Sequence, residues 1–101
     1  VADFFDPEIV KVVELEEKCR QQQVNDGCFP SLSQVPKKAL TLTIPALLSA
    51  RFIYCVVPGP TKAAAVGASI TGPVSTSCPA SILRRHLRAV LYLDEESAAL
   101  L

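Results

Sequence analysis

The chain has 101 residues, which is enough for one compact domain and too few for two. Half of its residues are apolar and 20% are charged, a composition that excludes an intrinsically disordered chain. Lysine plus arginine and aspartate plus glutamate total 10 each, so the overall charge does not favour a nucleic acid or another polyanion as partner.

The sequence contains no methionine, so we expect Val1 to be a processing site or the first residue of a piece of a longer protein. Residues 1–6 carry two aspartates where a secretory signal would be basic, which predicts no targeting segment. The longest apolar stretch, 39–57, is interrupted by Pro45 and Arg51, so no membrane span is expected.

The cysteines are scattered along the chain without a Cys-x-x-Cys pair: Cys19, Cys28, Cys55 and Cys78. This spacing disfavours both a zinc site and a disulfide framework. Cys55 lies inside an apolar run, where a small buried thiol is a common occupant. The cysteines therefore predict a reduced chain that works in the cytoplasm and holds no metal.

Three elements are expected in the first part of the chain. Residues 9–15 mix β-branched and charged side chains, which predicts a strand near a sheet edge. Residues 16–24 are good helix formers without an apolar stripe, and the turn residues 25–27 end this predicted helix. A loop bounded by two prolines is expected over 30–36.

Short apolar runs and helical stretches that begin with proline alternate in the rest of the chain. Residues 39–43 read as a strand, and Pro45 is placed for the first turn of a short helix. The run 51–57 continues without polar alternation, which predicts a strand covered on both faces.

Two further helices and a last strand complete the pattern. We expect helices over 61–70 and 79–85 and a strand over 89–93. This order is typical of right-handed βαβ crossovers in a parallel sheet, so the predicted fold class is α/β. Ligands of such sheets bind beyond the carboxyl ends of the strands.

The strongest local motif follows the predicted strand that ends at Val57. There the chain passes through Gly59 into a helix that opens with Pro60, with Thr61 and Lys62 in its first turn. Free amides and the positive end of a helix dipole attract anions, and a lysine adds a full charge. The motif predicts a phosphate site, although a solvated surface lysine explains the same residues.

Other polar clusters have structural explanations beside functional ones. The hydroxyl-rich stretch 75–81 suits a helix cap, with contact to a ligand as the alternative. His86, the only histidine, is expected at a solvated basic helix end. It is the one base near Cys78 in the sequence, and nucleophilic catalysis by that thiol is not favoured. The acidic stretch 94–96 reads as a solvated strand end.

Four blocks in a fixed order resemble the C-terminal part of glucosamine-6-phosphate deaminases, also called isomerases. These blocks are Val35-Pro36-Lys37-Lys38-Ala39-Leu40-Thr41-Leu42, Val56-Val57-Pro58-Gly59-Pro60-Thr61-Lys62-Ala63, Ser77-Cys78-Pro79-Ala80-Ser81-Ile82-Leu83 with His86, and Tyr92-Leu93-Asp94-Glu95. The resemblance implies that residues 1–101 form the C-terminal portion of a larger Rossmann-like, three-layer α/β domain. It also implies conversion of glucosamine 6-phosphate to fructose 6-phosphate and ammonia, without a cofactor.

The resemblance assigns roles to few residues of this chain. Lys62 matches the family lysine that binds the sugar phosphate, with Gly59 and Thr61 beside it, whereas Arg20 is only a candidate substitute for a family arginine. The family's proton-transfer aspartate and its Asp-Gly-His and Asn-Glu-Pro motifs are expected before Val1. The chain alone is therefore expected to hold no catalytic residue. The implied partners are a hexosamine 6-phosphate and further copies of the chain, and no membrane or nucleic acid.

Two other functions occur on the same kind of scaffold. Some relatives of the family hydrolyse 6-phosphogluconolactone, and others sense sugar phosphates in transcriptional regulators without turning them over. A sensor would carry a helix-turn-helix before this segment, whereas an enzyme would carry the Asp-Gly-His block.

Overall fold

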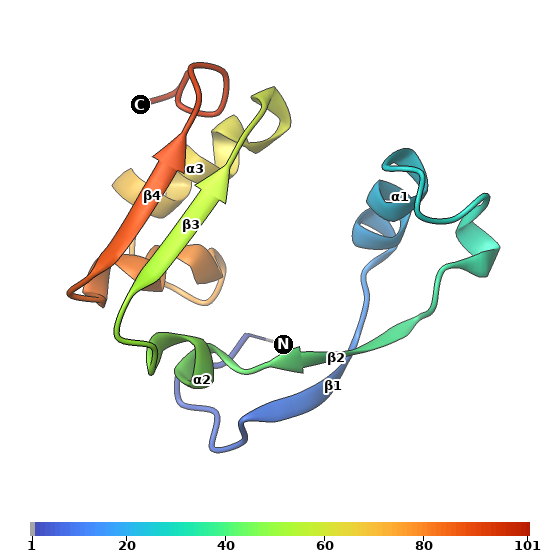
Figure 1. The fold of residues 1–101 in the computed structure, drawn as a ribbon, viewed down its shortest axis with the longest axis horizontal. Helices are drawn as coiled ribbons and strands as arrows, with labels where there is room; N and C mark the ends of the chain where they lie inside the picture. The colour runs from blue at the N-terminus through green and yellow to red at the C-terminus, as the bar shows by residue number, and fades with distance from the viewer. Residues whose placement is uncertain (1) are drawn as a thin grey trace.

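The computed structural model describes residues 2–101, which form two small two-stranded sheets (Figure 1). The first sheet pairs β1 (Val10–Glu14) with β2 (Lys38–Leu42), and the second pairs β3 (Ile53–Val57) with β4 (Ala89–Leu93). The short helix α2 (Ile44–Leu48) lies between the two sheets in the chain. Every strand and helix expected from the sequence is present, and no bound differs from its expected residue by more than two residues.

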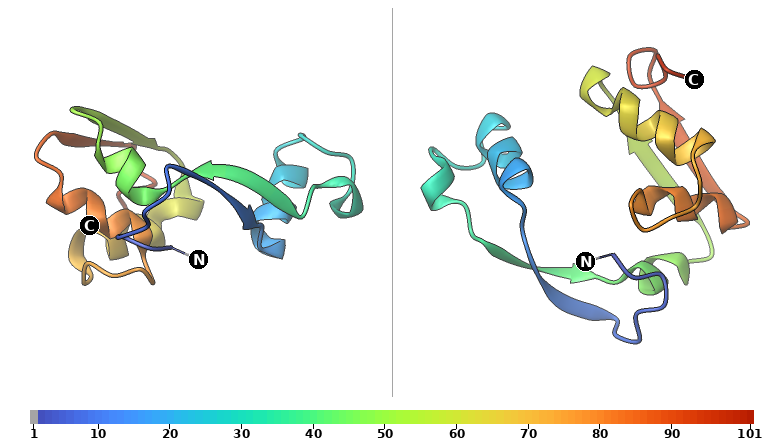
Figure 2. Two further views of the ribbon diagram at one scale, coloured as in Figure 1. Left: turned by 90° about the horizontal axis from the view of Figure 1, so that it is seen from below. Right: turned by 180° about the vertical axis from the view of Figure 1, so that it is seen from behind.

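The first sheet is an antiparallel arm that carries a helix at its far end. β1 and β2 pair with Val12 opposite Leu40, and α1 (Glu17–Asn25) packs with a 3-10 helix at Leu32–Gln34. The expected parallel pairing is wrong for these two strands. The segment between them turns back at the end of the arm, so β2 returns beside β1 in the opposite direction (Figure 2).

The second sheet is a parallel unit and confirms the α/β class. β3 and β4 run in the same direction with Cys55 opposite Leu91. The chain between them forms α3 (Ala63–Thr71) and a 3-10 helix at Pro79–Arg85, which contact each other and cover one face of the sheet (Figure 1). Parallel neighbours require such a crossover. A tight turn reverses the direction of the chain, so it can join only antiparallel strands.

Thr43 explains how the arm continues into α2. Its side chain is buried, and its hydroxyl donates to the Glu8 carbonyl oxygen at 2.6 Å. Oγ1 of Thr43 also accepts from the Ala46 amide at 3.4 Å, so Thr43 caps the helix, and Pro45 occupies the first turn as expected. One hydroxyl thereby joins the start of α2 to the segment that leads into β1.

The expectation that β3 is covered on both faces is wrong for residues 2–101. Tyr54 is 65% exposed and Val56 is 70% exposed, whereas Cys55 and Val57 face α3 and are half-buried. The physical reason is that helices of this chain lie on one side of the sheet (Figure 2). On the other face Tyr54 and Tyr92 lie near each other, with ring centroids 6.4 Å apart, but no helix of the described residues covers them.

The described chain exposes more surface than a compact monomer of its mass. Its accessible surface is 7213 Å², compared with about 5,500 Å² expected for a folded 10.8 kDa monomer. Its radius of gyration is 14.7 Å, against about 13 Å for a compact chain of this length. The buried hydrophobic side chains among residues 2–101 are Val35, Val66 and Ile82.

This exposed surface predicts association through the outer face of β3 and β4. We expect the wild-type chain to self-associate or to unfold with low cooperativity, because exposed apolar patches of this kind favour contact with another surface. The double substitution Tyr54→Thr and Val56→Thr should reduce the association measured by analytical ultracentrifugation. Leu87→Thr is the matched control, because Leu87 is 98% exposed and lies in a loop away from this face.

A monomeric wild-type chain with a cooperative melt at high temperature would contradict this prediction. Equal association of the double variant and the Leu87→Thr control would contradict it as well.

Candidate phosphate-binding site

The candidate site begins where β3 ends. After Val57 the chain turns at Gly59, whose φ of 92° lies in the left-handed region that side chains with a Cβ atom rarely adopt. A 3-10 turn at Pro60–Lys62 follows, and α3 starts at Ala63. The helix expected from residue 61 therefore begins as a 3-10 turn and becomes an α-helix only at Ala63. Lys62 is the N-cap residue of α3 instead of a first-turn residue.

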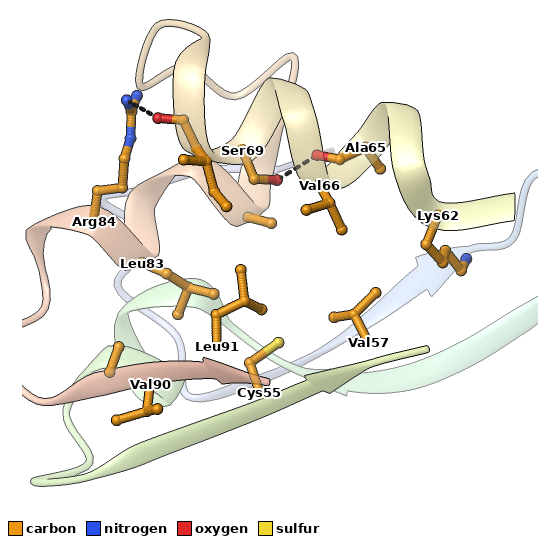
Figure 3. Close-up of a pocket in the computed structure, with 13 residues that line it drawn as sticks. Cys55, Val57, Lys62, Ala65, Val66, Ser69, Leu83, Arg84, Val90 and Leu91 are labelled. Atoms are coloured by element: carbon orange, nitrogen blue, oxygen red, sulfur yellow. Dashed lines mark hydrogen bonds between the residues drawn. The ribbon is translucent and has the colours of Figure 1, made fainter. Parts of the chain in front are cut away.

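Lys62 has no ionic partner in residues 2–101. Its side chain is half-buried, and it makes no hydrogen bond or ion pair within the described chain. Figure 3 shows Lys62 at the edge of a pocket, next to Val57 at the end of β3. An ammonium group without a counter-ion at the carboxyl end of a parallel strand can bind an anionic ligand.

The amide of Gly59 is already hydrogen-bonded, which corrects the expectation of free amides in this turn. It donates to Oδ2 of Asp94 at 2.9 Å. Asp94 directly follows β4, and because β3 and β4 are parallel, their carboxyl ends meet at one edge of the sheet. The acidic stretch 94–96 is thus more than a solvated strand end, because its first carboxylate holds the turn after β3.

Asp94 is itself fixed by Ser97. The Ser97 amide donates to Oδ1 of Asp94 at 2.7 Å, and the buried Ser97 hydroxyl accepts from the Asp94 amide at 3.1 Å. The amides of Ser97 and Gly59 stabilise the charged carboxylate and hold the pKa of Asp94 below its usual value. This role was not predicted from the sequence, and the signal that could have indicated it is the spacing Asp-x-x-Ser, because aspartate and serine side chains often bond to nearby backbone amides.

Of the sequence-predicted site residues, the structure brings Gly59, Thr61 and Lys62 together and leaves Arg20 apart. Thr61 is exposed, and its hydroxyl makes no hydrogen bond within residues 2–101. Arg20 lies on α1, at the far end of the antiparallel arm from α3 (Figures 1 and 2). Its guanidinium donates to the carbonyl oxygens of Leu32 at 2.9 Å and Val35 at 3.2 Å, so Arg20 holds the adjoining loop.

The hydroxyls of stretch 75–81 order a loop and do not cap the helix that follows. Cys78 occupies the N-cap position of the 3-10 helix without a side-chain hydrogen bond to it. The fully buried Ser81 hydroxyl donates to the Cys78 carbonyl oxygen at 2.6 Å and accepts from the Ser75 amide at 3.0 Å. The capping expectation is therefore wrong in its detail. The hydroxyl that bonds to the loop backbone belongs to Ser81, which lies inside the 3-10 helix and not before it.

His86 is a bridge between loops, in contrast to the solvated helix end that was expected. Its Nδ1 accepts from the Arg88 amide at 3.0 Å, and its Nε2 lies 2.6 Å from the Ala50 carbonyl oxygen. An Nε2 proton satisfies both contacts at once, which corresponds to a neutral ring. The imidazole thus joins the segment before β3 to the segment before β4.

The pocket beside Lys62 lies between the sheet and the helices. It encloses about 420 Å³, and Figure 3 shows that apolar side chains from both layers, such as Val57, Val66 and Leu91, line it. A sugar phosphate needs hydrogen-bonding partners for its hydroxyls, and this lining offers few. The pocket is a gap in the packing, and the functional feature is the lysine at its rim.

The described part of the chain holds neither a group of metal ligands nor a membrane-spanning helix. Within residues 2–101, no three histidine, cysteine, aspartate or glutamate side chains are grouped so that they could hold a metal ion. The same residues include no helix with the length and apolar character needed to cross a bilayer. All four cysteines are free thiols.

Comparison with known proteins gives one consistent result, although no family model matches the chain. The chain is 39% identical over 83 residues to the glucosamine-6-phosphate deaminase of Pseudoalteromonas translucida, with 80% of this chain and 31% of the relative covered. It is 42% identical over 89 residues to glucosamine-6-phosphate deaminase 1 of Bacillus subtilis, with 88% and 36% covered.

A solved structure agrees with these relatives. It is described as a monomeric glucosamine-6-phosphate deaminase and a missing link of the NagB superfamily. It superposes with a TM-score of 0.90 at 37% identity and covers 99% of this chain and 40% of its own. The chain spans about a third of the length of the curated relatives it matches.

The Asp94 hydrogen bonds predict a pH-dependent contribution to stability. Because the pKa of Asp94 is lowered by folding, its contribution is present above about pH 4 and is lost as the pH falls through the lowered pKa. Asp94→Asn should therefore lower the melting temperature at pH 6 and leave it unchanged in strong acid. Glu95→Gln is the control, since the Glu95 carboxylate makes no hydrogen bond within residues 2–101. A deficit of Asp94→Asn that is the same at every pH would refute the assignment.

Proposed function

We propose that this chain, a homologue of the glucosamine-6-phosphate deaminases, forms the C-terminal, phosphate-binding part of such an enzyme. The complete protein would convert glucosamine 6-phosphate to fructose 6-phosphate and ammonia. The observation that supports the proposal most directly is Lys62, an unpaired cation at the end of a parallel strand in a chain about 40% identical to these deaminases.

The position of Lys62 suits a phosphate for physical reasons. In α/β sheets, ligands bind beyond the carboxyl ends of the strands, and the N-terminus of a following helix attracts anions. Lys62 stands where β3 ends and α3 begins. We assign the charge to Lys62 and a hydrogen bond to the free Thr61 hydroxyl, while Gly59 allows the backbone turn. Arg20 has no part in this assignment, because its guanidinium already donates to two carbonyl oxygens.

The two titratable side chains that bridge the ends of β3 and β4, Asp94 and His86, are not free for the proton transfers of the reaction. Moving a proton between C2 and C1 requires a carboxylate or imidazole that is free to exchange it. Both nitrogens of His86 are engaged by the backbone, and Asp94 is held by Gly59 and Ser97. We infer that acid and base residues come from the part of the protein that the curated relatives have and this chain lacks.

Association and location follow from the same proposal. Covering the exposed face of β3 and β4, whether by the rest of an α/β domain or by another copy, would bury the side chains of Tyr54 and Val56. Four free thiols suit the reducing cytoplasm, which is where we place the protein.

Two other functions would use the same phosphate site. A 6-phosphogluconolactonase or a sugar-phosphate sensor would also bind a sugar phosphate, so the lysine alone does not separate these functions from a deaminase. The relatives named above are glucosamine-6-phosphate deaminases, which favours the deaminase function over these two. Release of ammonia from glucosamine 6-phosphate by the complete protein, without hydrolysis of 6-phosphogluconolactone, is the result that separates the three.

Replacement of Lys62 by alanine should weaken sugar-phosphate binding by the complete protein. A charge-assisted lysine–phosphate contact contributes about 1.5–3 kcal/mol, or roughly 10- to 150-fold in affinity. Isothermal titration with glucosamine 6-phosphate and with glucosamine should show the loss for the phosphorylated ligand alone. Lys38→Ala removes an exposed lysine of β2 and serves as control. Equal weakening for both ligands, or none for either, would return Lys62 to the role of a solvated helix residue.

The 101-residue chain alone should have no deaminase activity. General acid and base groups contribute about 10²–10⁴-fold each, and a lysine that binds phosphate cannot replace them. A coupled assay for fructose 6-phosphate should give the same signal with the purified chain as without protein. Product formation above that blank would show that this chain holds the catalytic residues.

A further inference from the structure

The charges of this chain are separated along its sequence although they cancel in total. Residues 27–93 contain no aspartate or glutamate, so all 10 acidic residues lie in 1–26 and 94–101. The same central segment holds most of the basic residues: Lys37, Lys38, Arg51, Lys62, Arg84, Arg85 and Arg88. A neutral chain therefore carries a segment that is only positive.

Three of these arginines line one concave surface at the amino-terminal ends of β3 and β4. This surface, here called the arginine pocket, encloses about 440 Å³ and is lined by Leu48, Arg51, Arg85, His86, Leu87 and Arg88. No ion pair involves these arginines within residues 2–101. The pocket lies at the opposite end of β3 from Lys62, so it is separate from the candidate phosphate site.

Phe52 orients two of the guanidinium groups. The Cζ atom of Arg51 lies 5.4 Å from the centroid of the Phe52 ring, and that of Arg88 lies 5.2 Å from it. Cation–π contacts of this length hold both arginines near one ring. Two like charges at one ring repel each other, and a bound anion would remove that repulsion.

His86 fixes the backbone of the pocket and does not offer a nitrogen to a ligand. Its ring accepts from the Arg88 amide and reaches the Ala50 carbonyl oxygen. Arg51 and Arg88 each adjoin one of these bridged segments, so the His86 ring keeps their backbones together. Arg85, in contrast, makes no hydrogen bond or ring contact within residues 2–101, and its donors are available.

We propose that the arginine pocket binds a diphosphate group, either free or carried on an organic ligand. Three guanidiniums match the charge of about three that two linked phosphates carry near neutral pH. The planar donors of arginine suit phosphate oxygens in a bidentate geometry. This site does not depend on the proposed deaminase function, because it uses neither Lys62 nor the turn at Gly59.

The test is titration of the 101-residue chain with inorganic pyrophosphate at low ionic strength. Arg85→Gln should weaken binding about fivefold, as expected for one exposed charge pair. Lys38→Gln removes an equal charge from the same basic segment outside the pocket and should change the affinity less than about twofold. Orthophosphate should bind more weakly than pyrophosphate, because it can engage fewer of the guanidiniums.

A second pair of variants separates this pocket from the candidate phosphate site and from loss of folding. Arg88→Gln should also weaken pyrophosphate binding while the circular dichroism spectrum stays that of the wild type. In the Lys62→Ala background, where the candidate phosphate site has lost its charge, Arg85→Gln should still weaken pyrophosphate binding about fivefold. Equal losses for Arg85→Gln and Lys38→Gln would overturn the proposal. So would a loss confined to Lys62→Ala, or a wild-type chain that does not bind pyrophosphate.

Discussion

The hydrogen bond from the Gly59 amide to the Asp94 carboxylate is the contact on which the candidate site depends. It joins the ends of β3 and β4, two segments that are 35 residues apart in the sequence and become neighbours because the strands are parallel. Without this bond, the amide of Gly59, in the left-handed turn, would have no hydrogen-bond acceptor from another segment of the described chain. The position of Lys62 is thus set by a carboxylate that does not contact it.

A second bridge of the same kind exists at the opposite ends of these strands. The neutral ring of His86 connects the segments before β3 and β4, as Asp94 connects the segments after them. Two polar side chains therefore fix both ends of a sheet that has only two strands. The Asp94 bridge holds the turn that leads to Lys62, and the His86 bridge holds the segments that carry the two arginines around Phe52.

Local sequence signals were sufficient for most elements of this fold. Pro45 located the first turn of α2. Gly72 occupies the C-cap of α3, where an added Cβ atom would lie 2.6 Å from the Ala68 carbonyl oxygen, so the position requires glycine. Contacts between distant segments could not be predicted in this way. The antiparallel return of β2 and the contacts of Asp94 and Arg20 depend on which segments meet in space, and propensity does not encode that.

The one clear error about burial concerns β3 and has a physical meaning. A strand with a single covered face usually alternates apolar and polar residues, and a strand without alternation is typical of a sheet covered on both sides. Tyr54 and Val56 follow the second pattern, yet they are exposed in the described chain. Their neighbours across the pair, Val90 and Tyr92, are apolar and exposed as well. The sequence of this sheet is thus suited to a third layer, and an apolar surface that meets this face would complete the packing without disturbing the cations at either end.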